Sequence, residues 1–286
     1  MTFSVVIATR NRAALLDGAL TSLRAQAEPP PFEIVVVDNG SIDATPAVAR
    51  AHDARYVYVA EPNRGKARNA GVAAASGERI LFVDDDVVLP AGFLAAHARG
   101  HAEGSGSLAV SGPIVNVPSA DERPTPSAAN FSRAFFVTCN VSVPVDDLRA
   151  VGGFDESFDL YGWEDTDLGV RLRERGVRRG FVWDAYLWHI KPPTIESLDE
   201  ALGKALEKAR MAARFVRKHP TGRVKLATGA YALNLLRARI VAPPFAQPLL
   251  AGLASATGLP PFVQVLAREA LLDNVYTNEL RAHLRG

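Results

Sequence analysis

The chain has 286 residues, of which 48% are hydrophobic and 22% are charged. This composition is typical of a globular protein and provides enough apolar residues for one large core or two smaller ones. The single cysteine, Cys139, excludes an intrachain disulfide and a zinc site built from several cysteines, and it fits a reducing compartment. Because the N-terminus runs directly into a strand-like segment without a basic leader, we expect a cytoplasmic protein.

The net charge of +1 hides an asymmetry along the chain. Residues 200–286 contain 13 Lys and Arg against 5 Asp and Glu, a net charge of +8, which leaves −7 for residues 1–199. A basic tail of this kind is either the solvated face of a set of helices or a region attracted to an anionic membrane or another polyanion.

The first 90 residues alternate between strand-like and helix-like patterns. Such alternation is typical of a parallel sheet covered by helices, in which ligands bind at the carboxyl ends of the strands. The pattern predicts strands at 3–8, 33–37, 56–60 and 80–83, and helices at 13–26, 45–52 and 66–76.

Three consecutive carboxylates, Asp84, Asp85 and Asp86, follow the last of these strands. They repel one another, and burial of an unpaired carboxylate is costly, so we expect a positive group beside them. The preceding loop, residues 61–71, is basic, contains glycine and opens a helix, which suits phosphate oxygens. Carboxylates near such a loop suit a hard divalent cation. The two segments together predict a metal-bound nucleoside diphosphate; an adenine dinucleotide fits less well, because the first strand lacks the glycine fingerprint.

A second group of acids, Glu164, Asp165 and Asp167, occupies the first turn of a helix predicted over 165–175. One acid would be enough to complement the helix dipole. Three acids after the aromatic and glycine-containing segment Tyr161-Gly162-Trp163 predict an acceptor site with a catalytic carboxylate.

Four segments, VVIATRNR, VVVDNGSID, NRGKARNAG and LFVDDDV, resemble in their order and spacing the nucleotide-sugar-binding half of family 2 glycosyltransferases. Two later segments, VGGFDESF and GWEDTDLGVRLRERG, resemble the acceptor half of the same family, including members related to galactosyltransferases. The resemblance implies the α/β GT-A fold, a Rossmann-like mixed and mainly parallel sheet flanked by helices. We expect a nucleotide-sugar-binding half at 1–115, an acceptor-binding and catalytic half at 116–194, and a helical C-terminal extension at 195–286.

The resemblance also implies roles for individual residues. Asp165 would be the general base, with Glu164 as an orienting or acceptor-binding partner, and Asn140 and Trp163 would contact the acceptor. A Mn²⁺ or Mg²⁺ ion would be held by Asp86 and His189, and the role of Asp85 in metal binding stays open. Asp38 would bind the base and Asp84 the ribose, and the other donor-binding residues would be Ala8, Thr9, Arg10, Asn63, Lys66, Arg68 and Asp85.

These roles predict a metal-dependent transferase that moves a sugar from a nucleoside diphosphate to a hydroxyl acceptor in glycan, glycolipid or natural-product biosynthesis. A base opposite the leaving group implies inversion at the sugar carbon. Because a carboxylate suits a uracil or thymine imide, Asp38 favours UDP or dTDP donors. The alternatives are a sugar-phosphate nucleotidyltransferase, which would need a glycine-rich N-terminal loop, and a non-catalytic nucleotide-sugar-binding protein. No nucleic-acid partner is expected.

The C-terminal region contains an amphipathic pattern at 196–218 and an uncharged segment at 240–267. Five prolines in the uncharged segment argue against a straight membrane-spanning helix. We expect helices that pack on the catalytic domain or form a homo-oligomer contact. The alternative is an interfacial anchor at the cytoplasmic face of a membrane, flanked by Arg237, Arg239 and Arg268.

Overall fold

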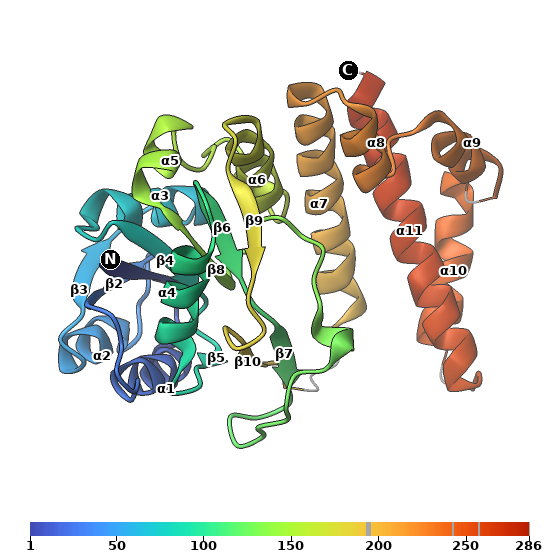
Figure 1. Ribbon diagram of the computed structural model, residues 1–286. Coiled ribbons are helices and arrows are strands. Elements are labelled where there is room, and N and C mark those ends of the chain that lie inside the picture. Colours follow the sequence, from blue (N-terminus) through green and yellow to red (C-terminus); the bar gives the residue numbers. More distant parts are fainter. Residues whose placement is uncertain (193–195, 242, 257, 286) are drawn as a thin grey trace. The chain divides into compact units, whose positions relative to one another are not determined.

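The computed structural model describes residues 1–192, 196–241, 243–256 and 258–285 and divides into two compact units (Figure 1). The first unit comprises residues 1–159 and 164–194, and the second comprises residues 160–163 and 195–286. The first unit therefore holds both predicted halves of the catalytic region except for residues 160–163, and the boundary between the halves at residue 115 stays a prediction.

A seven-stranded sheet forms the centre of the first unit. Strand β8 is antiparallel to β4 and β6, and the remaining neighbours are parallel, so the predicted mixed and mainly parallel sheet is confirmed. The carboxyl ends of β1, β2, β3, β4, β6 and β9 consequently share one edge of the sheet. In spatial order the strands are β3 (Arg55–Tyr58), β2 (Phe32–Asp38), β1 (Phe3–Thr9), β4 (Arg79–Val83), β8 (Asn140–Pro144), β6 (Leu108–Ser111) and β9 (Arg178–Phe181).

Helices cover both faces of this sheet because successive strand residues point to opposite sides. On one face Val5 and Ile7 pack in the core with Leu16 of α1. On the other face Val6 packs with Val72 of α3. The first face is covered by α1 (Ala13–Arg24), α2 (Thr45–Ala51) and α4 (Phe93–Glu103), and the second by α3 (Arg64–Ala74), α5 (Val145–Ala150) and α6 (Glu164–Glu174).

A small second sheet carries His189, which follows the aromatic residues Tyr186 and Trp188 in the sequence. Its strands are β5 (Val87–Val88), β10 (Leu187–Ile190) and β7 (Ile114–Val117), with β10 in the middle. In the antiparallel pairing of β10 with β5, His189 lies opposite Val87, the residue after the acid triplet. This pairing explains how a residue 103 positions later in the sequence reaches Asp86.

The apolar segment 135–143 forms a strand only from Asn140 onward. Phe136 is buried in the core instead, with its ring edge-on to Phe82 at a centroid distance of 6.1 Å. The backbone N–H of Thr138 donates to the Asp165 carboxylate and therefore cannot join a ladder. Apolar composition would allow a strand over all of residues 135–143, but these tertiary contacts limit it to Asn140 and the residues after it.

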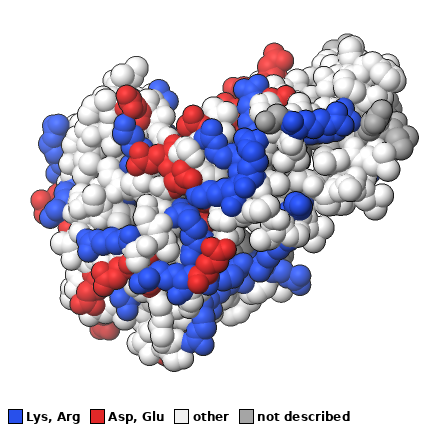
Figure 2. Space-filling view, turned by 90° about the horizontal axis from the view of Figure 1, so that it is seen from above, with Lys and Arg blue, Asp and Glu red and all other residues white. Residues whose placement is uncertain are grey.

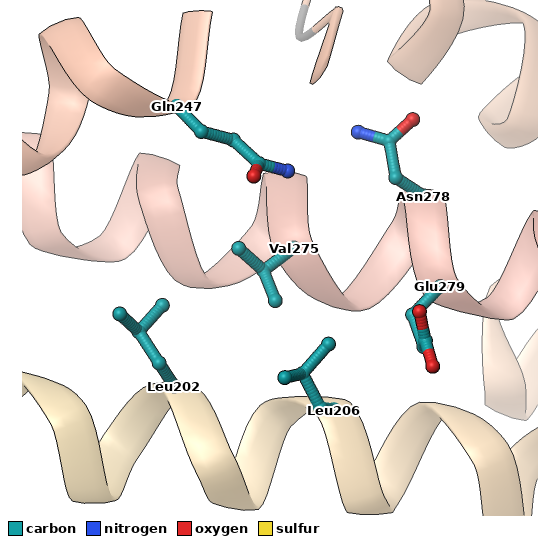
Figure 3. A pocket seen from close by; sticks show the side chains of 6 residues that line it. All are labelled: Leu202, Leu206, Gln247, Val275, Asn278 and Glu279. Carbon is teal, nitrogen blue, oxygen red and sulfur yellow. The ribbon is translucent and has the colours of Figure 1, made fainter. Parts of the chain in front are cut away.

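The second unit is helical, as predicted for the C-terminal extension. Its long helices are α7 (Leu198–Lys218) and α11 (Pro261–Arg285), with α8 (Gly222–Thr228), α9 (Ala232–Val241) and α10 (Gln247–Ser255) between them. A pocket among α7, α10 and α11 has apolar and polar walls (Figure 3), lined by Leu202, Leu206, Gln247, Val275, Asn278 and Glu279. Among the helices that the structure describes, none has both the length and the hydropathy needed to cross a membrane. Figure 2 shows one face of the molecule, on which basic and acidic side chains lie interspersed.

Candidate active site

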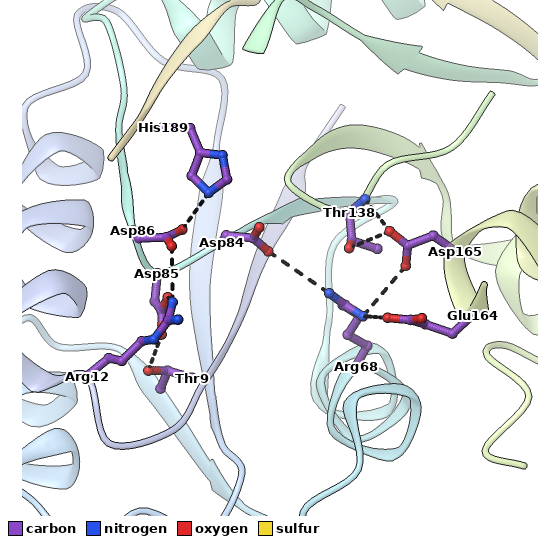
Figure 4. Close-up of polar contacts among 10 residues, drawn as sticks. All are labelled: Thr9, Arg12, Arg68, Asp84, Asp85, Asp86, Thr138, Glu164, Asp165 and His189. Atoms are coloured by element: carbon purple, nitrogen blue, oxygen red, sulfur yellow. Dashed lines mark hydrogen bonds and ion pairs between the residues drawn. The ribbon is translucent and has the colours of Figure 1, made fainter. Parts of the chain in front are cut away.

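The acid triplet at the end of β4 has a protein cation beside it. Asp85 is buried and accepts hydrogen bonds from Thr9 Oγ1 at 2.6 Å and from Arg12 Nη1 at 3.0 Å (Figure 4). The same Arg12 nitrogen lies 3.0 Å from Asp86 Oδ2. Repulsion between the two neighbouring carboxylates is therefore offset by one guanidinium.

Asp86 also contacts the histidine of β10. His189 Nε2 lies 3.0 Å from Asp86 Oδ1. Burial opposes ionisation of Asp86, but the hydrogen bond and charge of His189, together with Arg12, lower its pKa. The ligand atoms of Asp84, Cys139 and His189 lie within 4.8 Å of one another. Carboxylate oxygens and an imidazole nitrogen are ligands that Mn²⁺ accepts, so Asp84, Asp86 and His189 fit a divalent cation. Burial raises the pKa of the Cys139 thiol, which is therefore not suited to be a ligand of such an ion.

Arg68 of α3 joins the acid triplet to the acids of α6. Its guanidinium is 4.0 Å from Asp84 Oδ1, 3.3 Å from Glu164 Oε1 and 3.6 Å from Asp165 Oδ1. Burial alone would lower the pKa of this guanidinium, but the three carboxylates raise it. A buried cation therefore lies between the end of a strand and the start of a helix that are 80 residues apart in the chain.

Asp165 is held from two sides. One of its oxygens faces Arg68, and the other, Oδ2, accepts the backbone N–H of Thr138 at 3.0 Å and the Thr138 hydroxyl at 2.8 Å. Two hydrogen bonds at Oδ2 and the ion pair with Arg68 at Oδ1 restrict the orientation of the carboxylate. The third acid, Asp167, is fully buried and pairs with Arg171 at 2.7 Å within the helix. Of the three acids in this turn, Glu164 and Asp165 face Arg68.

Glu164 has a different electrostatic environment from Asp86. Burial and the charge of Asp165 raise the pKa of Glu164, and the charge of Arg68 opposes this rise. The pKa of Asp84 is likewise raised by burial, against the effect of Arg68. These two carboxyls therefore bind protons more readily than free side chains do.

The predicted donor-binding residues lie in several places along the edge formed by the strand ends. Asp38 is buried, with its oxygens accepting the Ser41 N–H and the Tyr56 hydroxyl, each at 2.7 Å. Burial and this hydrogen bond raise the pKa of Tyr56 to about 12. Asn63 caps α3 by accepting the N–H of Lys66 at 2.9 Å.

The remaining donor-binding candidates lie at the surface or beside the first strand. The Lys66 ammonium is exposed and lies 2.8 Å from Glu61. Arg10 is exposed and Ala8 is half-buried, whereas Thr9 between them is buried and contacts Asp85.

The predicted acceptor residues Asn140 and Trp163 each have partners of their own in the structure. Asn140 is 1% exposed; its oxygen lies 3.0 Å from His97 Nε2, and its amide donates to the carbonyl oxygens of Pro113 and Ala185. The polar groups of its side chain are thus occupied inside the protein. Trp163 belongs to the second unit, where its indole stacks on Phe215 of α7 at a centroid distance of 5.5 Å.

Two site residues were missed in the sequence analysis. Repulsion within the triplet predicts a cation beside it. This cation is Arg12, the second arginine of ATRNR, which lies just before the start of α1. Thr138 is a polar residue in an apolar segment, a weak signal that a hydroxyl partner is needed nearby. Its partner Asp165 is 27 residues away in the chain, so the pair could not be recognised from local pattern.

Two family models match this chain. A model described as glycosyl transferase family 2 matches residues 4–152, just over half of the chain. The chain belongs to glycosyl transferase family 2. A second model, described as the N-terminal domain of galactosyltransferase, matches residues 125–205, which include Thr138, Glu164, Asp165 and His189.

Curated relatives of this family 2 chain include several bacterial glycosyltransferases. Validoxylamine A glucosyltransferase of Streptomyces hygroscopicus subsp. limoneus is 33% identical over 262 residues, covering 76% of this chain and 57% of the relative. The pre-mycofactocin glycosyltransferase of Mycobacterium tuberculosis is 27% identical over 195 residues, covering 61% of this chain and 40% of the relative. The chain thus spans between two fifths and three fifths of the length of these relatives.

Solved structures share the fold at low identity. The mannosyltransferase PcManGT of Pyrobaculum calidifontis, solved with GDP-Man and Mn²⁺, has a TM-score of 0.61 and 22% identity, covering 98% of this chain and 85% of that one. Residues 1–349 of S. aureus TarS with UDP-GlcNAc give a TM-score of 0.59 and 20% identity, covering 100% and 92%. With the sheet topology, these likenesses establish the predicted GT-A fold.

Proposed function

We propose that this family 2 chain is an inverting glycosyltransferase that moves a sugar from a nucleoside diphosphate to a hydroxyl acceptor. One observation carries the proposal: Arg68 joins two carboxylate groups of different character. The carboxylates at the end of β4 have the chemistry to hold a cation, which can in turn bind a diphosphate. The group at the start of α6 offers a carboxylate held ready to accept a proton.

Asp165 takes the role of general base. In the reaction, the acceptor oxygen bonds to the anomeric carbon while its proton passes to a carboxylate oxygen of Asp165. The bond between the anomeric carbon and the diphosphate oxygen breaks, and its electron pair leaves with the diphosphate. Asp165 suits this role because Thr138 orients it before the acceptor arrives. Attack on the face opposite the leaving group inverts the configuration of the sugar carbon.

Asp86 and His189 are the residues proposed to hold Mn²⁺ or Mg²⁺, with Asp84 and Asp85 beside them. When bound, such an ion offsets negative charge on the diphosphate. Arg12 and Arg68 bring further positive charge to the same edge of the sheet. The pairing of PcManGT with GDP-Man and Mn²⁺, and of TarS with UDP-GlcNAc, supports a nucleotide-sugar donor here as well. The preference for UDP or dTDP, which depends on Asp38, stays a proposal.

A thermal-shift screen of UDP-, dTDP- and GDP-sugars with and without MnCl₂ tests the donor site. We expect a nucleotide sugar to raise the melting temperature, and the rise to increase with Mn²⁺. His189→Ala should remove the Mn²⁺-dependent part. His52→Ala is a matched control. His52 Nε2 lies 2.7 Å from Asp17 Oδ1, so it makes a comparable pair with a carboxylate that does not belong to the triplet. No stabilisation by any nucleotide sugar would contradict the proposal.

For the second unit we propose peripheral contact with an anionic membrane surface. Residues 208–268 contain ten Lys and Arg and no Asp or Glu. Large apolar side chains of this segment are exposed, including Leu233, Phe245, Leu249 and Phe262. Because two copies of so basic a segment would repel each other, charge favours anionic lipid over a homo-oligomer. Sedimentation with phosphatidylglycerol but not phosphatidylcholine vesicles is expected, and dimerisation without vesicle binding would contradict it.

A further inference from the structure

A cluster of aromatic side chains lies at the same sheet edge as the acid triplet. Strand β9 is parallel to β6, and β6 runs in the direction of β4 because β8 is antiparallel to both. Trp183 follows the carboxyl end of β9, as Asp84 follows that of β4. Three strand spacings separate β4 from β9, which is about 14 Å.

The cluster consists of Phe131, Phe181 and Trp183. The rings of Phe131 and Trp183 are near-parallel, with 29° between their planes and 6.3 Å between centroids. Phe181 is edge-on to both, at 4.8 Å from Phe131 and 5.3 Å from Trp183. Phe131 is 45% exposed and Trp183 is 47% exposed. Two large aromatic residues therefore keep much of their surface in water, although the fold has already brought them together.

Two charged residues lie next to these rings, Arg179 in space and Asp184 in the sequence. The Arg179 guanidinium lies 5.2 Å from the Phe131 ring centre and 5.1 Å from that of Phe181, and it donates to the Ser132 carbonyl. Its Nε has no hydrogen-bond partner among the residues that the structure describes. Asp184, next to Trp183, has a side chain that is 77% exposed and pairs with Arg99 at 3.0 Å. The guanidinium thus lies over two of the three rings, and a carboxylate follows the third ring in the chain. Exposed aromatic surface next to charged groups suits a ligand that is itself apolar on its face and polar around its edge.

We infer that Phe131, Phe181 and Trp183 form a platform that binds a sugar ring of the acceptor. A pyranose has C–H groups on its face and hydroxyls around its rim, which match the rings and the neighbouring Arg179 and Asp184. A purely apolar partner would remove water from the exposed Asp184 carboxylate and offer it no hydrogen bond in return. This inference rests on the proposed function and extends it, because it makes the acceptor a glycoside or oligosaccharide.

The platform is also connected to the proposed base. The segment that begins at Phe131 reaches Thr138, whose N–H and hydroxyl orient Asp165. The proposed donor site follows β4 and the platform follows β9, and these two strands are about 14 Å apart, which is further than one sugar ring spans. The platform therefore holds a ring of the acceptor other than the one that receives the sugar.

Fluorine NMR of protein labelled with 5-fluorotryptophan tests the platform without a donor. The chain has three tryptophans, Trp163, Trp183 and Trp188, and Trp183→Phe assigns the signal of Trp183. On titration with maltose, cellobiose and lactose, we expect at least one disaccharide to shift the Trp183 signal saturably. Trp188 is only 8% exposed, so its signal should stay in place.

Two substitutions test whether sugar binding needs the rings of the platform or only an exposed aromatic residue anywhere on the surface. Phe131→Leu should weaken the apparent affinity for the disaccharide about tenfold. Tyr58→Leu is the matched control, because Tyr58 is 57% exposed on the opposite edge strand, β3, and should leave the affinity unchanged. Circular dichroism and thermal melting of both variants establish that they fold.

Three results would overturn the inference. They are a Trp183 signal that no disaccharide moves, an affinity that Phe131→Leu leaves intact, and a Trp183 signal that responds to UDP but to no sugar. The last would mean that the rings stack on a nucleobase. If Trp183 responds to sugars while the thermal-shift screen detects no donor, the proposed transfer fails but the carbohydrate platform stands.

Discussion

Two groups of three acids, similar in composition, have become different sites. Asp84, Asp85 and Asp86 are consecutive residues after a strand, and each faces a different set of partners: Arg68 for Asp84, Thr9 and Arg12 for Asp85, and Arg12 and His189 for Asp86. Glu164, Asp165 and Asp167 lie on one helical turn, where Asp167 pairs within the helix and the other two share Arg68.

The partners differ in how firmly they are held. The Arg12 side chain at the triplet is 50% exposed, so ligand and ion can exchange with it at low cost. The Arg68 side chain is 12% exposed, and the base candidate Asp165 is fixed further by Thr138. An adaptable acidic site suits donor and cation binding, and a rigid one suits proton transfer.

Removal of the base should have the largest effect. Asp165→Asn is expected to lower transfer about 1,000-fold, because the amide cannot accept the acceptor proton. The thermal shift caused by the donor and Mn²⁺ should stay close to that of the unmodified protein. Transfer is measured as nucleoside diphosphate released in the presence of acceptor. Asp146→Asn, at a side chain that is 90% exposed on α5, is the control, and wild-type turnover by Asp165→Asn would refute the assignment.

Removal of the proposed metal ligand should act on binding. Asp86→Ala is expected to weaken Mn²⁺-dependent donor binding about tenfold or more, and EDTA should reduce donor binding by the unmodified protein to a similar level. Calorimetric titration of the donor with and without Mn²⁺ measures both. Asp17→Ala removes the acid that pairs with His52, and it should change neither donor binding nor the effect of Mn²⁺ on it. If Asp86→Ala retained the full Mn²⁺ effect, Asp86 would not belong to the metal site.

The smallest effect concerns stability. Burial and Asp165 raise the pKa of Glu164. A carboxyl with a raised pKa in the folded state binds its proton more tightly when folded, so its contribution to stability is lost as pH rises through that pKa. Glu164→Gln should therefore raise the melting temperature at pH 7 by a few degrees, and this gain should disappear below about pH 4, the ordinary range of glutamate. Thermal melts across this range measure it; a gain independent of pH would exclude the charge as its cause.

Local pattern was enough to predict much of the fold. The buried run of β4 before the triplet, the alternation of strand and helix and the amphipathic α7 all follow from side-chain periodicity, which acts over a few residues. The same pattern placed acids at the end of β4 and at the start of α6, which are the two positions that the proposed mechanism uses. It also predicted that a cation must lie beside the triplet.

The identity of that cation, and the sharing of Arg68, depended on tertiary structure. Arg12 is 73 residues from Asp85, and Arg68 is 96 residues from Glu164. Strand order brought these pairs together, as it brought Phe131 to Trp183 and turned Asn140 inward to His97. The amino-acid sequence by itself determined which charges and rings the chain carries and on which elements. Only packing decided their partners, because contacts between distant segments follow from the arrangement of the sheet and not from spacing along the chain.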